Sequence, residues 1–480
     1  MFDSLEQKDS SFSNQKNGDE SNGTKVNFNH LFEGNFGNPT KKEDKSLKPK
    51  EFKFLDEKGK VKHEYLPKNV KKRNKSIREF DSNRIKIAVE KAMKSVNQLD
   101  TNLSEKITKN VLLRIIEKEY DFPSVDQIHT IVENVLMDER VHEVAREYIT
   151  YRNKNKPNIF NKRESIKPYE YPNFLNFVDA IRQSYWIHNE FDYSSDEQDL
   201  RVNLSKEENS AVLRSMLAIS QIESKVKNFW GNIYYHMPKP EIAKVGATFS
   251  ESEVRHEDAY SNLIELVGMN NIFENIMEIS VLKERSLFLE KVNKFKNSDD
   301  PKEFFETIIL FSMFVENVSL FSQFLIIMSF NKKKNYLKGI SNAIEATSKE
   351  EEVHANFGFT LINTIKEENP NWWNSDIINR ITKMAQEAFE TEDKILDWIY
   401  ENGDLNIIPK HHAQNYIKER LNSSLNSIGI DSVFLIDKEI QKETKWFDDS
   451  ISLMRNYDFF HKRPTTYSKR QKAVTGESIF

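Results

Sequence analysis

The chain has 480 residues, of which 30% are charged and 38% hydrophobic, and its formal net charge is −5. This length accommodates two or three domains with a large core, and the charge argues against a general role in binding nucleic acid or a membrane surface. With no cysteine, the chain has no disulfide, no thiolate metal ligand and no thiol-based catalysis of its own. Any metal site must therefore use His, Asp and Glu, which favour ions such as iron and manganese.

Residues 1–66 are rich in Ser, Asn, Gly, Lys and Asp. Such a segment offers too little apolar surface to offset the entropy lost on ordering, so we predict a disordered tail. Its start carries no apolar stretch of the kind found in signal peptides, and a cytoplasmic location is expected.

Residues 67–156 are predicted to form a small α+β domain. Residues 68–79 hold six cations and one acid and are expected to form a β-hairpin around residues 74–75. Asp81 is expected to cap a helix whose apolar residues recur at helical spacing. Further helices are expected at about 103–118, after Pro123, and at 141–154. Residues 157–175 are expected to be a linker.

Residues 176–460 are predicted to be an all-α bundle without strands. Its helices are expected at about 206–235, from Pro240 past 267, 273–295, 301–330, up to 370, and onward to 460. Residues 461–480 lose helical periodicity and are expected to be a flexible tail.

The apolar run 308–330 is long enough to suggest a membrane span. Glu316 near its middle favours a buried helix of a large bundle instead, because a lone carboxylate facing lipid is costly. In that position Glu316 needs a cationic partner inside the protein.

Two Glu-x-x-His pairs, each preceded by an isolated Glu in apolar company, form the strongest pattern in the chain. Within each pair the spacing of three places both side chains on one helix face. The isolated Glu lies 30 residues before the first pair and 35 before the second, as expected for antiparallel neighbouring helices. This is the arrangement of carboxylate-bridged dinuclear metal proteins. The predicted ligands are Glu223, Glu253, His256, Glu316, Glu351 and His354.

Aromatic residues accompany these ligands. Tyr260 lies four residues after His256 and shares its helix face, although spacing alone leaves open whether it only packs or is oxidised near the metals. Trp186 precedes the first ligand helix, and Tyr467 stands in the polar C-terminal tail.

Residues 165–480 resemble the small, radical-generating subunit of class I ribonucleotide reductase. The resemblance is carried by Trp-x-x-x-Glu-x-Asp at 186–192 and by the segments "FWGNI", "EVRHEDAY", "FVENVSLFSQF" and "EEEVHANFG". It implies a ferritin-like bundle, the six metal ligands named above, and a centre of two manganese ions, two iron ions, or one of each.

The same resemblance implies roles for other residues. Tyr260 falls at the position of the radical tyrosine, Trp186 at that of the internal relay tryptophan, and Glu350 at that of an acid coupling Trp186 to His256. Tyr467 would carry the radical to the large subunit, which holds the substrate-reducing thiols, and the C-terminal "GESIF" would dock there. The expected assembly is a homodimer acting with that large subunit.

The domain at 67–156 resembles an ATP-cone, a regulatory nucleotide-binding module, through "VKKRNKSIREFDSNRIKIAVEKA" and "VHEVAREYITYR". Clustered cations before a helix can hold a triphosphate. The expected ATP or dATP ligands are Lys71, Lys72, Arg73, Asp81, Arg84, Lys91 and His129. On the small subunit, such a module implies that dATP drives an inactive higher oligomer, a tetramer.

Two positions depart from the commonest family pattern, because Glu223 and Glu350 stand where Asp is usual. A first-position Glu resembles branches with manganese–iron or dimanganese centres, so the sequence leaves open whether Tyr260 or the metals hold the oxidising equivalent. Two rival interpretations are a stand-alone dimetal-carboxylate oxidase and a ferritin-like metal store.

Overall fold

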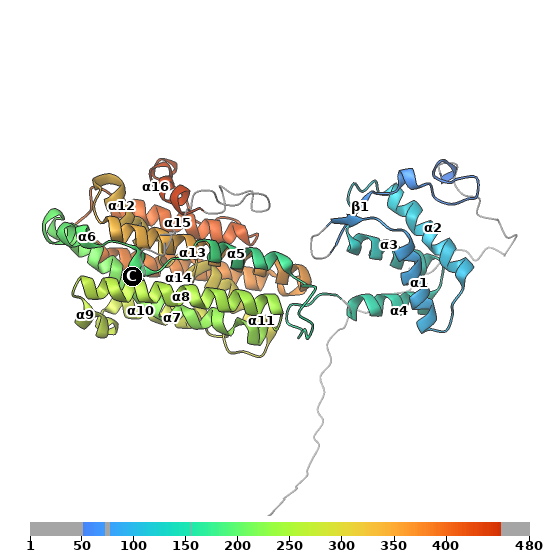
Figure 1. The fold of residues 1–480 in the computed structure, drawn as a ribbon, viewed down its shortest axis with the longest axis horizontal. Coiled ribbons are helices and arrows are strands. Elements are labelled where there is room, and N and C mark those ends of the chain that lie inside the picture. The colour runs from blue at the N-terminus through green and yellow to red at the C-terminus, as the bar shows by residue number, and fades with distance from the viewer. Residues whose placement is uncertain (1–50, 73–76, 155, 453–480) are drawn as a thin grey trace, which may run out of the picture. The chain divides into compact units, whose positions relative to one another are not determined.

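The computed structural model describes residues 51–72, 77–154 and 156–452, which are coloured in Figure 1. The chain divides after Tyr65 into two units. The predictions for residues 1–50, Arg73, Tyr467 and the tail 461–480 lie outside the described residues.

The end of the expected N-terminal tail has local structure, so the prediction of disorder up to residue 66 was wrong for this part. Short 3-10 helices span Glu51–Phe54 and His63–Tyr65, and an antiparallel bridge joins Leu55 to Val61. The rings of Phe54 and Tyr65 meet edge-on with centroids 5.1 Å apart. An average composition over 66 residues hides this aromatic contact.

In the second unit, a small α+β domain begins with the strands β1 (Asn69–Lys71) and β2 (Ile77–Glu79), paired antiparallel with Val70 opposite Arg78. Its helices are α1 (Asn83–Ser95), α2 (Thr101–Glu117), α3 (Val125–Asp138) and α4 (His142–Lys154). The N-cap residue of α1 is Ser82, one residue after the predicted Asp81, but the Asp81 carboxylate accepts a hydrogen bond from the backbone N–H of Asn83 at the helix start. Ser124 and Gln127 form a reciprocal capping box at the start of α3.

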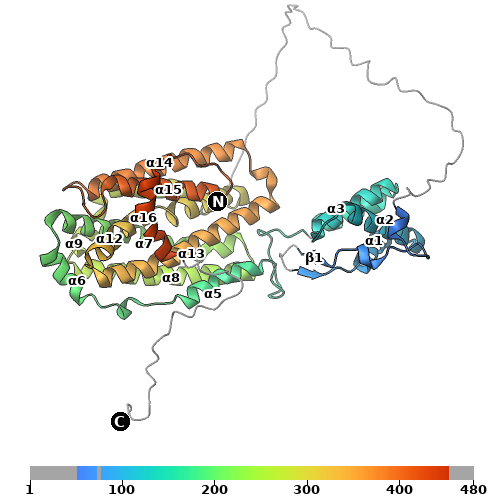
Figure 2. The ribbon, with the colours of Figure 1, turned by 90° about the horizontal axis from the view of Figure 1, so that it is seen from above.

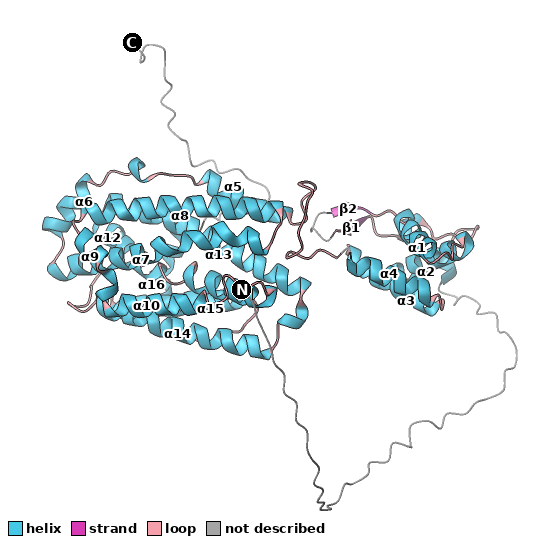
Figure 3. Cartoon of the chain, turned by 90° about the horizontal axis from the view of Figure 1, so that it is seen from below, coloured by secondary structure: helices cyan, strands magenta, loops and turns pink. Residues whose placement is uncertain are grey.

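The remainder of the described chain is a helical bundle (Figures 2 and 3). Its α-helices are α5 (Leu175–Gln183), α6 (Ser194–Gln198), α7 (Lys206–His236), α8 (Pro240–Leu266), α9 (Asn270–Glu274), α10 (Ser280–Val292), α11 (Pro301–Leu310), α12 (Phe321–Lys334), α13 (Lys338–Glu368), α14 (Ser375–Ile399), α15 (Lys410–Ser427) and α16 (Lys438–Ile451). Short 3-10 helices span Pro172–Phe174, His188–Glu190, Ile276–Glu278 and Pro370–Trp372, and π-helical turns span Asp199–Asn203 and Phe311–Val315.

The predicted linker 157–175 does not stand apart from the bundle. Ile159, Tyr171 and Phe174 are buried in its hydrophobic core. Glu368 of α13 accepts a hydrogen bond from the Ile159 N–H at 2.9 Å and another from the Tyr171 hydroxyl. Polar and proline-rich composition concealed these few anchoring side chains.

Two predicted helices are interrupted. The helix expected at 273–295 breaks into α9, a 3-10 turn and α10, and the helix expected at 301–330 opens into a π-helical turn at Phe311–Val315 before α12. Apolar periodicity continues through both breaks, so sequence alone does not reveal them. None of the helices within the described ranges is long and apolar enough to cross a membrane.

Candidate metal centre

The six predicted ligands come from four segments of the bundle and lie together in its interior. α7 supplies Glu223, the segment after the π-helical turn supplies Glu316, and α8 and α13 each supply a Glu-x-x-His pair. Each ligand residue is at most 2% exposed. A capping box at Ser205 begins α7 and Pro240 begins α8, and the length of these helices places their ligands well inside the bundle.

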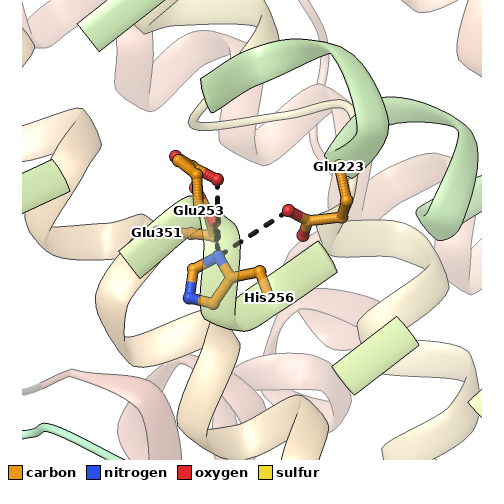
Figure 4. Close-up of side chains that lie close together, drawn as sticks. All are labelled: Glu223, Glu253, His256 and Glu351. Carbon is orange, nitrogen blue, oxygen red and sulfur yellow. Dashed lines mark ion pairs between the residues drawn. The ribbon is translucent and has the colours of Figure 1, made fainter. Parts of the chain in front are cut away.

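The ligand atoms form two overlapping groups. Glu223, Glu253, His256 and Glu351 have ligand atoms within 4.8 Å of one another, and so do Glu253, Glu316, Glu351 and His354. Figure 4 shows the first group, with carboxylates directed at the imidazole of His256. Glu253 and Glu351 belong to both groups, so these two carboxylates are placed to bridge a pair of cations.

Both histidines present the same nitrogen to the carboxylates. His256 Nδ1 lies 2.9 Å from Glu351 Oε1, and His354 Nδ1 lies 3.0 Å from Glu253 Oε1. Each Nε2 is held on the opposite side of its ring, by Glu350 Oε2 at 2.9 Å for His256 and by Ser252 Oγ at 2.9 Å for His354. Such outer contacts fix the orientation of a ligand imidazole.

The side chains of the protein alone do not balance the negative charge of this buried cluster. Burial raises the pKa of Glu223 to about 8 and raises that of Glu316 well above its usual range. Burial lowers the pKa of His256 and His354, but the surrounding carboxylates more than offset it and raise both pKa values. The cationic partner expected for Glu316 is therefore His354, whose Nδ1 lies 3.4 Å from Glu316 Oε2. The raised pKa values mean that the cluster binds protons to offset the charge of its carboxylates. Two divalent cations would neutralise these carboxylates better than protons do.

The donor set fits a dinuclear metal centre on a structural criterion as well. Buried polar atoms are nearly always hydrogen-bonded. Here both oxygens of Glu223, both oxygens of Glu253 and Nδ1 of each histidine make no hydrogen bond of ordinary geometry within the described chain, although each Nδ1 lies at ion-pair distance from a carboxylate. The unsatisfied atoms point into the same small volume, as ligands of bound cations do.

Glu316 is positioned by the break in its helix. The Glu316 N–H reaches back five residues to the Phe311 carbonyl at 3.2 Å, and Ser319 does the same to Phe314 at 2.9 Å. Two buried arginines bind the released carbonyls: Arg285 donates to Ser319 O, and Arg420 donates to Asn317 O. A π-helical turn of this kind widens the helix and is common at functional sites.

The close approach of α13 to the π-helical turn also holds the segment that carries Glu316 in place. A Cβ at Gly358 of α13 would lie 2.4 Å from the Ser312 Cβ, so only glycine lets α13 pass the widened turn. Trp230 Nε1 donates a 2.9 Å hydrogen bond to Glu316 Oε1 and fixes the ligand from the α7 side.

Trp186 is connected to His256 through Glu350. The Trp186 indole donates to Glu350 Oε2 at 3.1 Å, and the same oxygen contacts His256 Nε2. The two rings are also stacked, with centroids 5.8 Å apart. Arg255 donates to both oxygens of Glu350 at 3.1 and 3.2 Å, and Ser184 donates to Oε1 at 3.2 Å. Glu350 is therefore held by charge-assisted bonds between Trp186 and a candidate ligand.

Tyr260 is 1% exposed, and its hydroxyl lacks a hydrogen-bond partner among the described residues. Burial raises the pKa of Tyr260 well above its usual value, and the Glu223 carboxylate adds to this effect. The tyrosine is thus kept in its neutral phenol form beside the cluster.

The candidate nucleotide ligands of the small domain are mostly at its surface. Lys71, Asp81, Arg84 and Lys91 are exposed and Lys72 is half-buried. Arg84 pairs with Asp81 at 3.4 Å, and half-buried His129 contacts the Tyr148 hydroxyl at 2.8 Å. These contacts leave the nucleotide site a prediction.

Several residues that support the centre were not found from the sequence. They are Ser184, Trp230, Ser252, Arg255, Arg285 and Arg420. Arg255 stands beside His256 and Trp230 lies in "FWGNI", so neighbouring motifs offered a signal for these two. Arg285 and Arg420 are distant in sequence from the ligand they support, and only the tertiary structure reveals them.

The family described as "Ribonucleotide reductase, small chain" matches residues 163–442, and the "ATP cone domain" matches residues 68–157. A probable ribonucleoside-diphosphate reductase small subunit of Invertebrate iridescent virus 3 is 22% identical, over 66% of this chain and 86% of the relative. The ribonucleoside-diphosphate reductase subunit beta of Chlamydia pneumoniae is 23% identical, over 55% of this chain and 78% of the relative.

Among solved structures, the ribonucleotide reductase R2 subunit of Clostridium botulinum superimposes with a TM-score of 0.54 at 19% identity, covering 59% of this chain and 89% of that one. This likeness shows the fold. The predicted fold class, a ferritin-like helical bundle preceded by an ATP-cone, is confirmed.

Proposed function

The chain belongs to the ribonucleotide reductase small-chain family, a family of oxidoreductases, and we propose that it generates the oxidising equivalent for a separate large subunit. The observation that carries the proposal is the pair of overlapping ligand groups that share Glu253 and Glu351. We propose that Glu223, Glu253, His256, Glu316, Glu351 and His354 bind two metal ions there, each manganese or iron. Bound at this place, the ions would supply the one-electron oxidising chemistry that no side chain of the protein has.

The protein's own residues would hold the centre and isolate it. Phe249, Phe311 and Phe314 are fully or almost fully buried around the ligand helices and exclude water. Glu350 and Ser252 orient the two imidazoles from behind. A dry and rigid surrounding protects an oxidised state from quenching.

Trp186 and Glu350 would form the inner part of an electron path. Glu350 accepts a hydrogen bond from the Trp186 indole N–H at 3.1 Å and also contacts His256. The indole proton of Trp186 therefore has an acceptor when the ring is oxidised. Tyr467, outside the described residues, would continue the path to the large subunit. Tyr260 would be a second station, and whether it holds a radical depends on the metals bound.

The ATP-cone would give this subunit its own allosteric control. We propose that Lys71, Lys72, Arg73, Asp81, Arg84, Lys91 and His129 bind ATP or dATP, and that dATP converts a homodimer into an inactive tetramer. Support comes from the match of the cone domain to residues 68–157 and from the exposed cations at its β-hairpin. A cytoplasmic location belongs to the same proposal.

The decisive test is an assay with and without a class I large subunit. We expect reduction of ribonucleoside diphosphates only when both subunits are present, and Tyr467→Phe should stop turnover while leaving the metal content unchanged. Low-temperature electron paramagnetic resonance on metal-quantified protein would distinguish a tyrosyl signal from a mixed-valent manganese signal. Oxidation of a substrate by this chain alone would favour the stand-alone oxidase instead.

A further inference from the structure

A cavity of about 130 Å³ leads from the surface of the bundle towards the candidate metal centre. Exposed Ser261 and Asn270 lie at its outer part, and fully buried Glu223 and Tyr260 lie at its inner part. α7, α8 and the short α9 form its walls.

The lining of this cavity combines the apolar side chains of Ile264 and Phe273 with several oxygen donors. Glu223 and half-buried Glu257 contribute carboxylates, and Ser220 and Ser261 contribute hydroxyls. Both oxygens of Glu223 are buried and without a hydrogen-bond partner in the described chain. Carboxylate, hydroxyl and amide oxygens are the ligands that can replace water around a hard divalent cation.

The shell around the rest of the centre has a different chemistry. Phe249 packs against His354 with the two rings tilted, and Trp230 and Phe311 pack edge-to-face beside Glu316. A hydrated cation that crossed such an aromatic layer would lose its water ligands without replacement. The cavity beside Glu223 holds oxygen atoms of Glu257, Ser261 and Asn270 that can replace these water ligands, next to the apolar Ile264 and Phe273.

We infer that this cavity is the route by which divalent metal ions reach the buried centre, with Glu257 as a transient ligand that passes each ion to Glu223. The inference rests on the proposed function, because it requires the metal centre to exist. It adds a direction of loading: ions arrive at the group containing Glu223 and His256, and one moves on across the bridging carboxylates to the group containing His354.

The test measures the rate of metal uptake separately from the final metal content. Metal-free full-length protein is mixed with Mn²⁺ or Fe²⁺ under anaerobic conditions, uptake is followed in time, and bound metal is counted at the end. Glu257→Gln keeps the shape of the side chain and removes its charge, and Ser261→Phe narrows the outer part of the cavity. Asp258→Asn is the matched control, since Asp258 is an exposed acid next to Glu257 that does not line the cavity.

We expect Glu257→Gln and Ser261→Phe to slow uptake by about tenfold at low ionic strength, and Asp258→Asn to leave the rate unchanged. The final metal content should be the same in all variants, because none of them removes a ligand. If Ser261→Phe fails to fold, as judged by thermal unfolding, Glu257→Gln still decides.

Uptake at the unmodified rate in Glu257→Gln overturns the inference. The same holds if uptake is unchanged but the variants, once loaded, react more slowly with O₂, since the cavity would then be an oxidant route. An unmodified protein that takes up no paired metal ions overturns the proposed function itself, and this result is distinct because it concerns the final content and not the rate.

Discussion

The candidate metal centre of the bundle and the basic hairpin of the cone both gather charges of one sign, but they do so in opposite surroundings. In the bundle, four carboxylates at most 2% exposed converge with two histidines. At the cone hairpin, Lys68, Lys71 and Arg78 are exposed to water. Buried charges must find their partners inside the protein, so their geometry is fixed before any ligand binds, whereas exposed charges are solvated and constrained little.

Removal of one buried candidate ligand should have the largest effect of the changes considered in the two regions. We expect His354→Ala or Glu316→Ala to abolish loading of the paired site, because each removes a donor from the second ligand group. Metal content by elemental analysis measures the effect. His411→Ala, an exposed histidine of α15, is the control and should keep the full content. A His354→Ala protein that still holds two metal ions per chain would contradict the ligand assignment.

Removal of Arg285, the buried arginine that supports the Glu316 segment, should have the next largest effect. Arg285→Ala leaves Glu392, 2% exposed and 3.7 Å from the guanidinium, without its cation. We expect the free energy of unfolding to fall by about 3 kcal/mol, measured by denaturant titration. The double variant Arg285→Met with Glu392→Met removes both charges and should recover most of this loss. Equal destabilisation in the single and double variants would show that lost packing, and not an unpaired charge, is responsible.

The corresponding change in the cone should be smaller and confined to nucleotide binding. Lys71→Ala with Lys72→Ala removes two cations, and we expect dATP affinity to fall by about tenfold while metal content and stability are kept. Calorimetric titration with dATP measures the change. Lys118→Ala, an exposed lysine at the end of α2, serves as the control. Unchanged affinity in the double variant would remove the hairpin from the nucleotide site.

The smallest expected effect is the loss of a helix cap in the cone. Asp100 accepts hydrogen bonds from the backbone N–H groups of Asn102 and Leu103 at the start of α2. Asp100→Ala should destabilise the cone by about 1 kcal/mol, and Asp100→Ser should retain most of the cap. Thermal unfolding measures the stability of the cone, and the metal content reports on the candidate centre of the bundle. The metal content should not change. A loss of metal in Asp100→Ala would show that the cone and the bundle are energetically coupled.

The convergence of the six candidate ligands could be predicted from the sequence because helical geometry converts spacing into position. Glu-x-x-His places two donors on one face, long α7 brings Glu223 to the same depth, and the π-helical turn before α12 brings Glu316 there. The link from Trp186 through Glu350 to His256 was expected only from the family resemblance, and its two hydrogen bonds lie at 3.1 and 2.9 Å. The role of these residues in electron transfer stays a prediction.

The sequence by itself determined the helical bundle, the small α+β domain and the set of buried acids, because apolar periodicity and local capping act over a few residues, and the family resemblance identified the small domain as an ATP-cone. Only the tertiary structure decided where the helix opens around Glu316, which arginines bind the released carbonyls, and where a cavity reaches Glu223. These features arise from contacts between segments far apart in the chain, such as Arg420 with Asn317 and Gly358 with Ser312. Such contacts depend on how whole helices pack, and local patterns carry no record of that packing.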